Sequence, residues 1–102
     1  MAKIIRGTTP VIEYVFKDVQ LSDIAVAILT VKQDNVIKIE KPLQDAIVGE
    51  SIAWRLTQQE TLQLKSRVDA ILVCDWKLTN GVRGRSKILS VDVEDPGKNE
   101  VI

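Results

Sequence analysis

The sequence contains no histidine and a single cysteine, Cys74, among its 102 residues. The absence of histidine removes the side chain that most often acts as general base, activator of a nucleophile or zinc ligand. One cysteine cannot form an internal disulfide or a zinc site built on thiolates. Cys74 lies on the apolar face of an expected strand, so we expect it to be buried. We therefore expect a protein that is not an enzyme and that has no cofactor and no metal site.

Long apolar segments are also missing. The best apolar run, 24–31, is far shorter than the roughly 20 residues that a helix needs to cross a bilayer. The first residues, 1–7, lack the apolar core of a signal peptide. We therefore expect no membrane partner and no signal peptide, and a location in the cytoplasm.

Neither sign of charge is in excess, since 14 Lys and Arg balance 14 Asp and Glu. This balance removes the attraction that drives non-specific binding to nucleic acids, and it leaves little self-repulsion to oppose assembly. A glycine-rich phosphate loop is absent too: the segment 81–85 lacks the lysine and the strand-to-helix context of a P-loop. We therefore expect no nucleic-acid partner.

What the sequence does contain is alternation of apolar and polar residues, which is typical of β-strands. The alternating segments are 11–16, 24–33, 36–40, 51–56, 68–78 and 82–94. Apolar residues make up 45% of the chain, which is enough for one core. The pattern predicts an all-β fold of about six or seven antiparallel strands, which would form a β-sandwich or a small barrel. Of the two we expect the sandwich, with an immunoglobulin-like arrangement. It would occupy residues 1–95 as a single domain, followed by a polar C-terminal tail over 96–102.

One short helix is expected near residues 58–64. Thr57 and Glu60 have the spacing of a capping box, in which each side chain bonds the backbone N–H of the other residue. A helix this short is not stable alone, so Leu62 or Leu64 must pack against a sheet.

Two hairpins are expected. The segment 24–33 is interpreted as a central strand, and after the turn signal Asp34-Asn35 the segment 36–40 returns with Ile37 and Ile39 inward. The second hairpin joins 68–78 to 82–94 through Asn80-Gly81, a strong signal for a two-residue type I′ turn. Such a loop would place opposite each other Leu72 and Leu89, Ala70 and Val91, Val68 and Val93, and Trp76 and Arg85. The last pair would form a cation–π contact.

Candidate interface residues lie near the tip of this second hairpin. Arg83, Arg85 and Lys87 alternate, so they are expected to form a basic row on one strand face. The row fits a contact with an acidic partner or phosphate, and it also fits an edge strand protected by charge against unwanted pairing. Trp76 is expected either to pack in the core or, if it is partly exposed, to act as a binding hot spot of an interface. The possible interface is therefore Trp76, Arg83, Arg85 and Lys87, together with the strand edge that follows Pro10.

Three segments resemble small proteins encoded in prophages of Gram-positive bacteria. They are the opening Ile4-Ile5-Arg6-Gly7-Thr8-Thr9-Pro10, the middle Leu56-Thr57-Gln58-Gln59-Glu60-Thr61-Leu62 and the closing Glu100-Val101-Ile102. Those proteins are about this long, so the resemblance covers nearly the whole chain. More remotely, the chain is similar to the N-terminal domain of phage baseplate upper proteins, a β-sandwich that attaches a larger appendage to the baseplate. The resemblance implies a phage structural or tail-associated protein without catalytic residues.

The leading hypothesis is therefore a prophage-encoded structural protein of a tail or baseplate. It would dock to other phage structural proteins or to itself as a homo-oligomer, in the host cytoplasm or in the virion. A second hypothesis is a non-virion adaptor or chaperone for phage assembly. A third is a small carbohydrate- or ligand-binding β-module, in which Trp54 or Trp76 would stack on a sugar.

Overall fold

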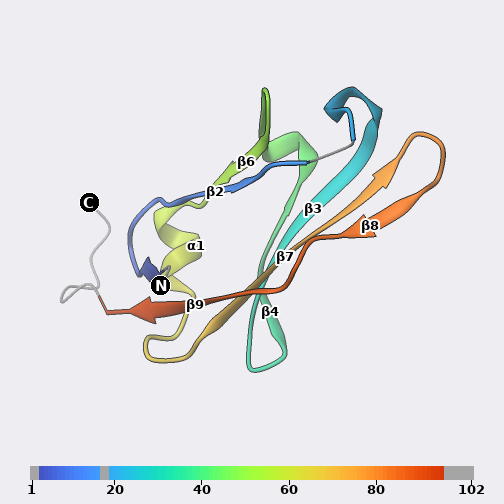
Figure 1. Cartoon of the computed structure of the whole chain (residues 1–102). Coiled ribbons are helices and arrows are strands. Elements are labelled where there is room, and N and C mark those ends of the chain that lie inside the picture. The colour runs from blue at the N-terminus through green and yellow to red at the C-terminus, as the bar shows by residue number, and fades with distance from the viewer. Residues whose placement is uncertain (1–2, 17–18, 96–102) are drawn as a thin grey trace.

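The computed structural model describes residues 3–16 and 19–95, which form two β-sheets packed face to face (Figure 1). The strands are β1 (Lys3–Ile5), β2 (Val11–Tyr14), β3 (Ile24–Gln33), β4 (Val36–Pro42), β5 (Ile47–Val48), β6 (Ile52–Arg55), β7 (Ala70–Leu78), β8 (Arg83–Arg85) and β9 (Leu89–Glu94). The helical elements are α1 (Gln58–Leu62) and the single 3-10 turns η1 (Leu21–Asp23) and η2 (Leu43–Asp45). The predicted tail 96–102 and the closing motif within it lie outside the described residues.

The order of the strands is that of an immunoglobulin-like sandwich. One sheet has the order β1-β9-β7-β3-β4, with β8 also paired to β7, and the other has the order β2-β6-β5. The order β9-β7-β3-β4 corresponds to strands G, F, C and C′ of the immunoglobulin fold. The order β2-β6-β5 corresponds to its strands B, E and D. The predicted all-β sandwich is therefore confirmed. It differs in detail, because the described residues hold nine strands and β1 runs parallel to β9.

The core lies between the two sheets, as the alternation predicted. Trp54 and Leu56 are fully buried on the β6 side, and they face Leu29 of β3 and Leu72 of β7, which are also fully buried. The Trp54 indole donates its Nε1–H to the Pro42 carbonyl at 2.9 Å, so its one polar group is satisfied in the core. Cys74 is also fully buried, as expected.

The first hairpin has the predicted turn. Asp34 and Asn35 both have positive φ, 52° and 64°, which is the backbone conformation of a type I′ turn. The strand β4 then contains a bulge, because the pairing changes from Lys32 with Ile37 to Val31 with Ile39. Lys38 is the extra residue, so Ile37 and Ile39 no longer share a face.

The expectation that Ile37 points inward is therefore wrong. Ile39 is 4% exposed and belongs to the core, whereas Ile37 is 52% exposed on the opposite face of the sheet. A bulge shifts every side chain beyond it relative to simple alternation, and nothing in the alternating pattern marks its position.

The second hairpin has the predicted register only in the half far from its tip, where β7 pairs with β9. Ala70 pairs with Val91 and Leu72 with Leu89, as predicted. Nearer the tip the pairing has slipped by one residue, since Trp76 lies opposite Gly84 rather than Arg85. One extra residue in the segment 86–88 accounts for the difference between the two halves.

The turn explains this slip. The Gly81 N–H donates to the Leu78 carbonyl at 3.0 Å, and the Leu78 N–H donates to the Val82 carbonyl at 2.7 Å. The loop therefore holds three residues, with Gly81 at φ +90° as its left-handed residue, instead of the predicted two-residue type I′ turn. The predicted pair of Val68 with Val93 is also absent, because the Val93 carbonyl accepts from the Arg67 N–H at 2.9 Å.

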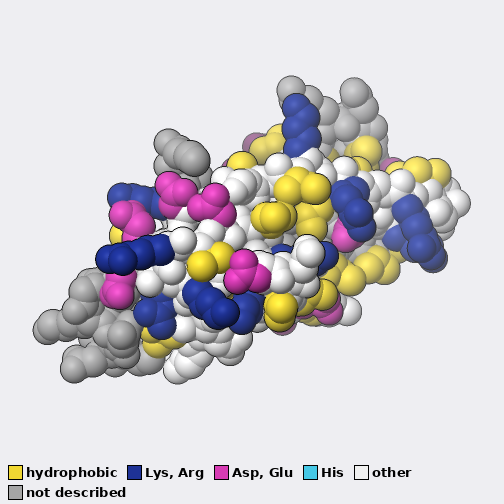
Figure 2. All heavy atoms as spheres, turned by 90° about the horizontal axis from the view of Figure 1, so that it is seen from below, with side chains coloured by type: hydrophobic (Ala, Val, Ile, Leu, Met, Phe, Trp, Pro, Cys, Tyr) yellow, Lys and Arg dark blue, Asp and Glu magenta, His cyan; other side chains and the backbone are white. Residues whose placement is uncertain are grey.

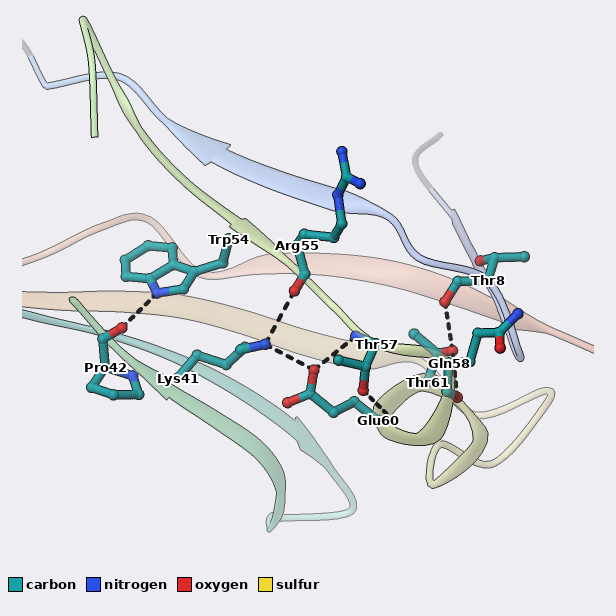
Figure 3. A network of polar contacts seen from close by, with 9 residues as sticks. All are labelled: Thr8, Lys41, Pro42, Trp54, Arg55, Thr57, Gln58, Glu60 and Thr61. Atoms are coloured by element: carbon teal, nitrogen blue, oxygen red, sulfur yellow. Dashed lines mark hydrogen bonds and ion pairs between the residues drawn. The ribbon is translucent and has the colours of Figure 1, made fainter. Parts of the chain in front are cut away.

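The capping box of α1 is confirmed (Figure 3). The Thr57 hydroxyl accepts the Glu60 N–H at 3.1 Å, and the Glu60 carboxylate accepts the Thr57 N–H at 2.8 Å. The same carboxylate accepts a hydrogen bond from Lys41 of β4 at 2.9 Å, and Lys41 also donates to the Arg55 carbonyl at 3.1 Å. Leu64, just after the helix, is 1% exposed, so the short helix is held by both polar and apolar contacts.

Acid is expected to weaken this connection between α1 and β4. Burial acts to raise the pKa of Glu60, but the Thr57 and Lys41 hydrogen bonds and the Lys41 charge outweigh it, so the pKa is lowered from 4.5. A carboxyl whose pKa is lowered by folding stabilises the fold above its unfolded pKa, and this contribution is lost as the pH falls through the folded pKa. Glu60→Gln is therefore expected to lower the urea midpoint at pH 7, and by less once the pH has fallen below the lowered pKa of Glu60.

The control for this measurement is Glu50→Gln, because Glu50 is exposed. It is expected to leave the midpoint unchanged at both pH values. An equal loss for Glu60→Gln at neutral and acidic pH would show that the charge of Glu60 does not contribute.

Candidate functional site

The outward face of the six-stranded sheet carries an unusual number of aliphatic side chains. We call this surface the outer face and define it by the residues of β3, β4 and β7 that point away from β2-β6-β5: Val26, Ile28, Thr30, Lys32, Ile37, Glu40, Ile71, Val73, Asp75 and Lys77. Val26, Ile37 and Ile71 are between 40% and 52% exposed. The solvated face of an antiparallel sheet is normally polar, so this composition is typical of a contact surface.

The middle of the outer face is hollowed. Thr30 and Val73 lie opposite each other on β3 and β7 and are only 6% and 9% exposed, although they point away from the core. They lie in a shallow hollow of about 290 Å³. Its other lining residues are Lys32, Ile37, Glu40, Ile71, Asp75, Arg85 and Ile88. Figure 2, seen from below Figure 1, shows hydrophobic side chains standing between basic and acidic ones.

A second hollow, of about 550 Å³ and widely open, lies at the β7–β8 hairpin. It is lined by Asp75, Trp76, Arg83, Gly84 and Arg85. The Arg85 Nε donates to Asp75 at 2.5 Å, so Arg85 is held over the sheet by a carboxylate, and the predicted stacking on Trp76 is replaced by this ion pair. The hollow therefore combines an aromatic ring, a carboxylate and two arginines.

Trp76 is fixed in position from two sides. A Cβ added to Gly84 would lie 2.3 Å from the indole, so the ring rests directly on the glycine backbone. Phe16 contacts the ring edge to face, with centroids 5.1 Å apart. Trp76 is half-buried as a result, which leaves part of the indole at the surface beside Arg83 and Arg85.

The structure separates Lys87 from the other two basic residues. Arg83 and Arg85 belong to β8, which ends at Arg85. The extra residue in the segment 86–88 lies just beyond, and Lys87 lines a different hollow, of about 240 Å³, with Tyr14, Phe16 and Trp76. The predicted basic row therefore does not extend to Lys87.

The polar groups beneath this third hollow hold the hairpin together. The Ser86 hydroxyl accepts the Cys74 N–H at 2.9 Å and donates to the Lys87 carbonyl at 3.1 Å. Burial, followed by the charge of Asp75, raises the pKa of the Cys74 thiol to about 11, so the thiol stays protonated at neutral pH. A protonated, fully buried thiol packs as a small hydrophobic group and is not poised for nucleophilic attack.

Among the residues that the structure describes, no group of three or more Cys, Asp or Glu side chains could hold a metal ion. Within the same residues, no helix has the length and apolar character to cross a membrane.

The aliphatic half of the outer face was missed by the sequence analysis. Alternation over 68–78 predicts one buried face, which leaves Ile71 and Val73 on the other face, and the segment 24–33 is predicted only to be a central strand. The sequence does contain a signal for this surface, because both 24–33 and 68–78 carry apolar residues on both faces of the strand. Two neighbouring strands of this kind need other residues to cover both faces of their sheet. Among residues 3–16 and 19–95, one face of this sheet is covered, by β2-β6-β5.

Comparison of the chain with protein-family models, with curated proteins and with solved structures found no match.

Proposed function

We propose that this chain is a phage structural protein of a tail or baseplate, and that it acts by docking to another phage protein rather than by catalysis. The observation that carries the docking role is the outer face. Exposed Ile37 and Ile71 line its central hollow together with Arg85, and exposed Val26 lies near Arg83 at the β7–β8 hairpin. Aliphatic surface with a charged margin is typical of protein interfaces.

The phage assignment rests on the resemblance of the opening and middle segments, and these two segments touch in the structure. The Thr61 hydroxyl accepts the Gly7 N–H at 3.0 Å and donates to the Thr8 carbonyl at 2.9 Å. Arg6 donates to the Leu62 carbonyl at 3.1 Å. The shared motifs thus form one contact, between the chain that leaves β1 and the helix α1.

The charges of the outer face and β8 favour a different protein over a second copy. The basic residues are Lys32, Lys77, Arg83 and Arg85, and the acidic ones are Glu40 and Asp75. Because Asp75 is already paired with Arg85, the remaining charge is positive. Two copies packed through this surface would repel each other, whereas a partner with carboxylates around an apolar patch would be attracted.

Replacing both Arg83 and Arg85 with serine is expected to leave folding intact and to reduce incorporation into phage particles. Both side chains are exposed, so the change in stability should stay within about 0.5 kcal/mol. The loss of two rim charges should weaken docking about tenfold. The measurement is mass spectrometry of particles induced from a host that carries the variant gene, together with urea unfolding of the purified protein.

The matched control replaces two other exposed cations, Lys65 and Arg67, with serine. These side chains lie outside the outer face, so incorporation should be unchanged although the net charge falls equally. Equal incorporation of both double variants would place the interface elsewhere. Absence of the unaltered protein from intact particles would contradict the structural role, and its presence only in lysates, bound to another phage protein, would favour the assembly adaptor.

A further inference from the structure

The strand β2 has a free edge. It pairs with β6 on one side, and among residues 3–16 and 19–95 no strand pairs with its other side. In the immunoglobulin order, a strand A precedes B in this sheet. Here the first strand, β1, instead joins β9 in the other sheet, and Gly7 at φ +80° lies in the turn between β1 and β2. The position beside β2 is therefore open to one more strand.

The hydrogen bonds of the β2–β6 pair show which groups face this opening. The Leu56 N–H donates to the Pro10 carbonyl at 2.9 Å, so Pro10 belongs to a hydrogen-bonded pair. In an antiparallel ladder such pairs alternate, which turns the N–H and C=O groups of Ile12 and Tyr14 toward β6. The N–H and C=O groups of Val11 and Glu13 therefore point away from β6. They form a row of donors and acceptors about 7 Å apart.

This edge has no lysine, no blocking proline and no bulge, and its protection is limited to the shortness of β2 and the charge of Glu13. Native edges are commonly blocked by lysine, by proline or by a bulge. Pro10 does not block this one, because its missing N–H would face Leu56 rather than the opening. The side chains beside the edge are the β-branched Val11 and Val15, 49% and 68% exposed, and Glu13, whose carboxylate accepts a hydrogen bond from Ser51 at 2.8 Å.

The charge of Glu13 argues against a second copy as the occupant. If β2 paired antiparallel with its copy about a two-fold axis, Glu13 would lie opposite Glu13 of the copy or diagonal to it. Like charges at these positions are destabilising. A basic residue at the same position would be favourable, and β-branched residues two positions away would cover Val11 and Val15.

We propose that β2 receives an extended strand of a partner protein, with Lys or Arg opposite Glu13 and β-branched residues on either side. The backbone of the added strand bonds Val11 and Glu13, and the alternate side chains provide the selectivity. The inference rests on the proposed function, because it states how one docked protein is held.

The test uses the full chain and two synthetic peptides, Thr-Val-Thr-Lys-Thr-Val-Thr and the same peptide with Glu in place of Lys. Amide hydrogen exchange by NMR and the peptide dissociation constant are measured. The lysine peptide is expected to slow exchange at Val11 and Glu13, and the glutamate peptide is expected to bind about tenfold more weakly. Protection at other strands, or no protection by the lysine peptide, would overturn the inference.

Two variants separate the backbone contact from the charge. Glu13→Pro removes the outward N–H, whereas Glu13→Ser keeps it, and both lose the contact with Ser51. Glu13→Ser should bind both peptides equally, and Glu13→Pro should bind the lysine peptide at least about tenfold more weakly than Glu13→Ser does. Circular dichroism checks that both are folded. If Glu13→Pro is not folded, Val11→Pro against Val11→Thr makes the same comparison.

Equal binding of the lysine peptide by Glu13→Pro and Glu13→Ser would overturn strand addition. A dimer of the unaltered protein in light scattering that Glu13→Pro abolishes would also overturn the inference, because a second copy would then occupy the edge of β2. The outcome is independent of the arginine variants. If the double serine variant of Arg83 and Arg85 is not incorporated into particles, while Glu13→Pro and Glu13→Ser bind the lysine peptide equally, the proposed docking function stands and the added strand does not.

Discussion

Trp54→Ala is expected to lower the free energy of unfolding by about 4 kcal/mol. The indole is fully buried between the sheets, contacts Tyr14 edge to face at 6.2 Å and donates to the Pro42 carbonyl. Alanine would leave a cavity, and it would also leave that carbonyl without its partner. Because a domain of this size has only about 5–15 kcal/mol of stability, the variant should be close to unfolding at 37 °C.

Urea unfolding followed by Trp76 fluorescence measures this effect, since Trp76 remains in the variant. Trp54→Phe keeps most of the ring and loses the Nε1–H, so it should cost about 1–2 kcal/mol. Val82→Ala, at a residue that is 56% exposed, should change stability by less than about 0.5 kcal/mol. A midpoint for Trp54→Ala equal to that of Val82→Ala would contradict the central role of Trp54.

Gln33→Met is expected to cost about 3 kcal/mol, because one buried amide holds the segment between α1 and β7. Gln33 is 1% exposed at the end of β3. Its Nε2 donates to the carbonyls of Lys65 and Val68 at 2.8 and 2.9 Å, and its Oε1 accepts the Lys65 N–H at 2.7 Å. Methionine fills a similar volume but leaves all three backbone groups without this partner.

Gln33→Glu tests whether the hydrogen bonds, rather than the volume, are responsible. At neutral pH a carboxylate can still accept from Lys65, but it cannot donate to the two carbonyls, so it should destabilise at least as much as methionine. Gln59→Met, on the exposed side of α1, should be nearly neutral. Proteolysis near residues 65–68 should be faster in both Gln33 variants, and unchanged proteolysis would contradict this role.

The two proposed docking surfaces belong to different sheets and differ in their chemistry. The outer face offers aliphatic side chains beside Arg83 and Arg85, which favours an acidic and apolar partner surface. The edge of β2 offers backbone groups beside Glu13, which favours an extended basic segment. A module with two separate and selective surfaces is suited to joining two different neighbours in an assembly.

Features that depend on residues close together in the chain could be predicted from the sequence. The spacing of Thr57 and Glu60 predicted the capping box, because both of its hydrogen bonds are local. Alternation predicted the central strand 24–33 with the bounds that it has in the structure, because a strand between two others is buried along its length and its apolar residues therefore mark it. The turn at Asp34-Asn35 followed from the tolerance of these residues for positive φ.

The positions where simple alternation stops depend on how the folded strands pair. Two bulges, at Lys38 and within 86–88, moved Ile37 to the outer face and Lys87 away from Arg85, and no local pattern marks them. The roles of Gln33, of Gly84 beneath Trp76 and of the free edge of β2 likewise depend on partners from distant segments. The fold class was therefore accessible from local periodicity, whereas both candidate docking surfaces arise from how the strands pair and slip once the sheets have formed.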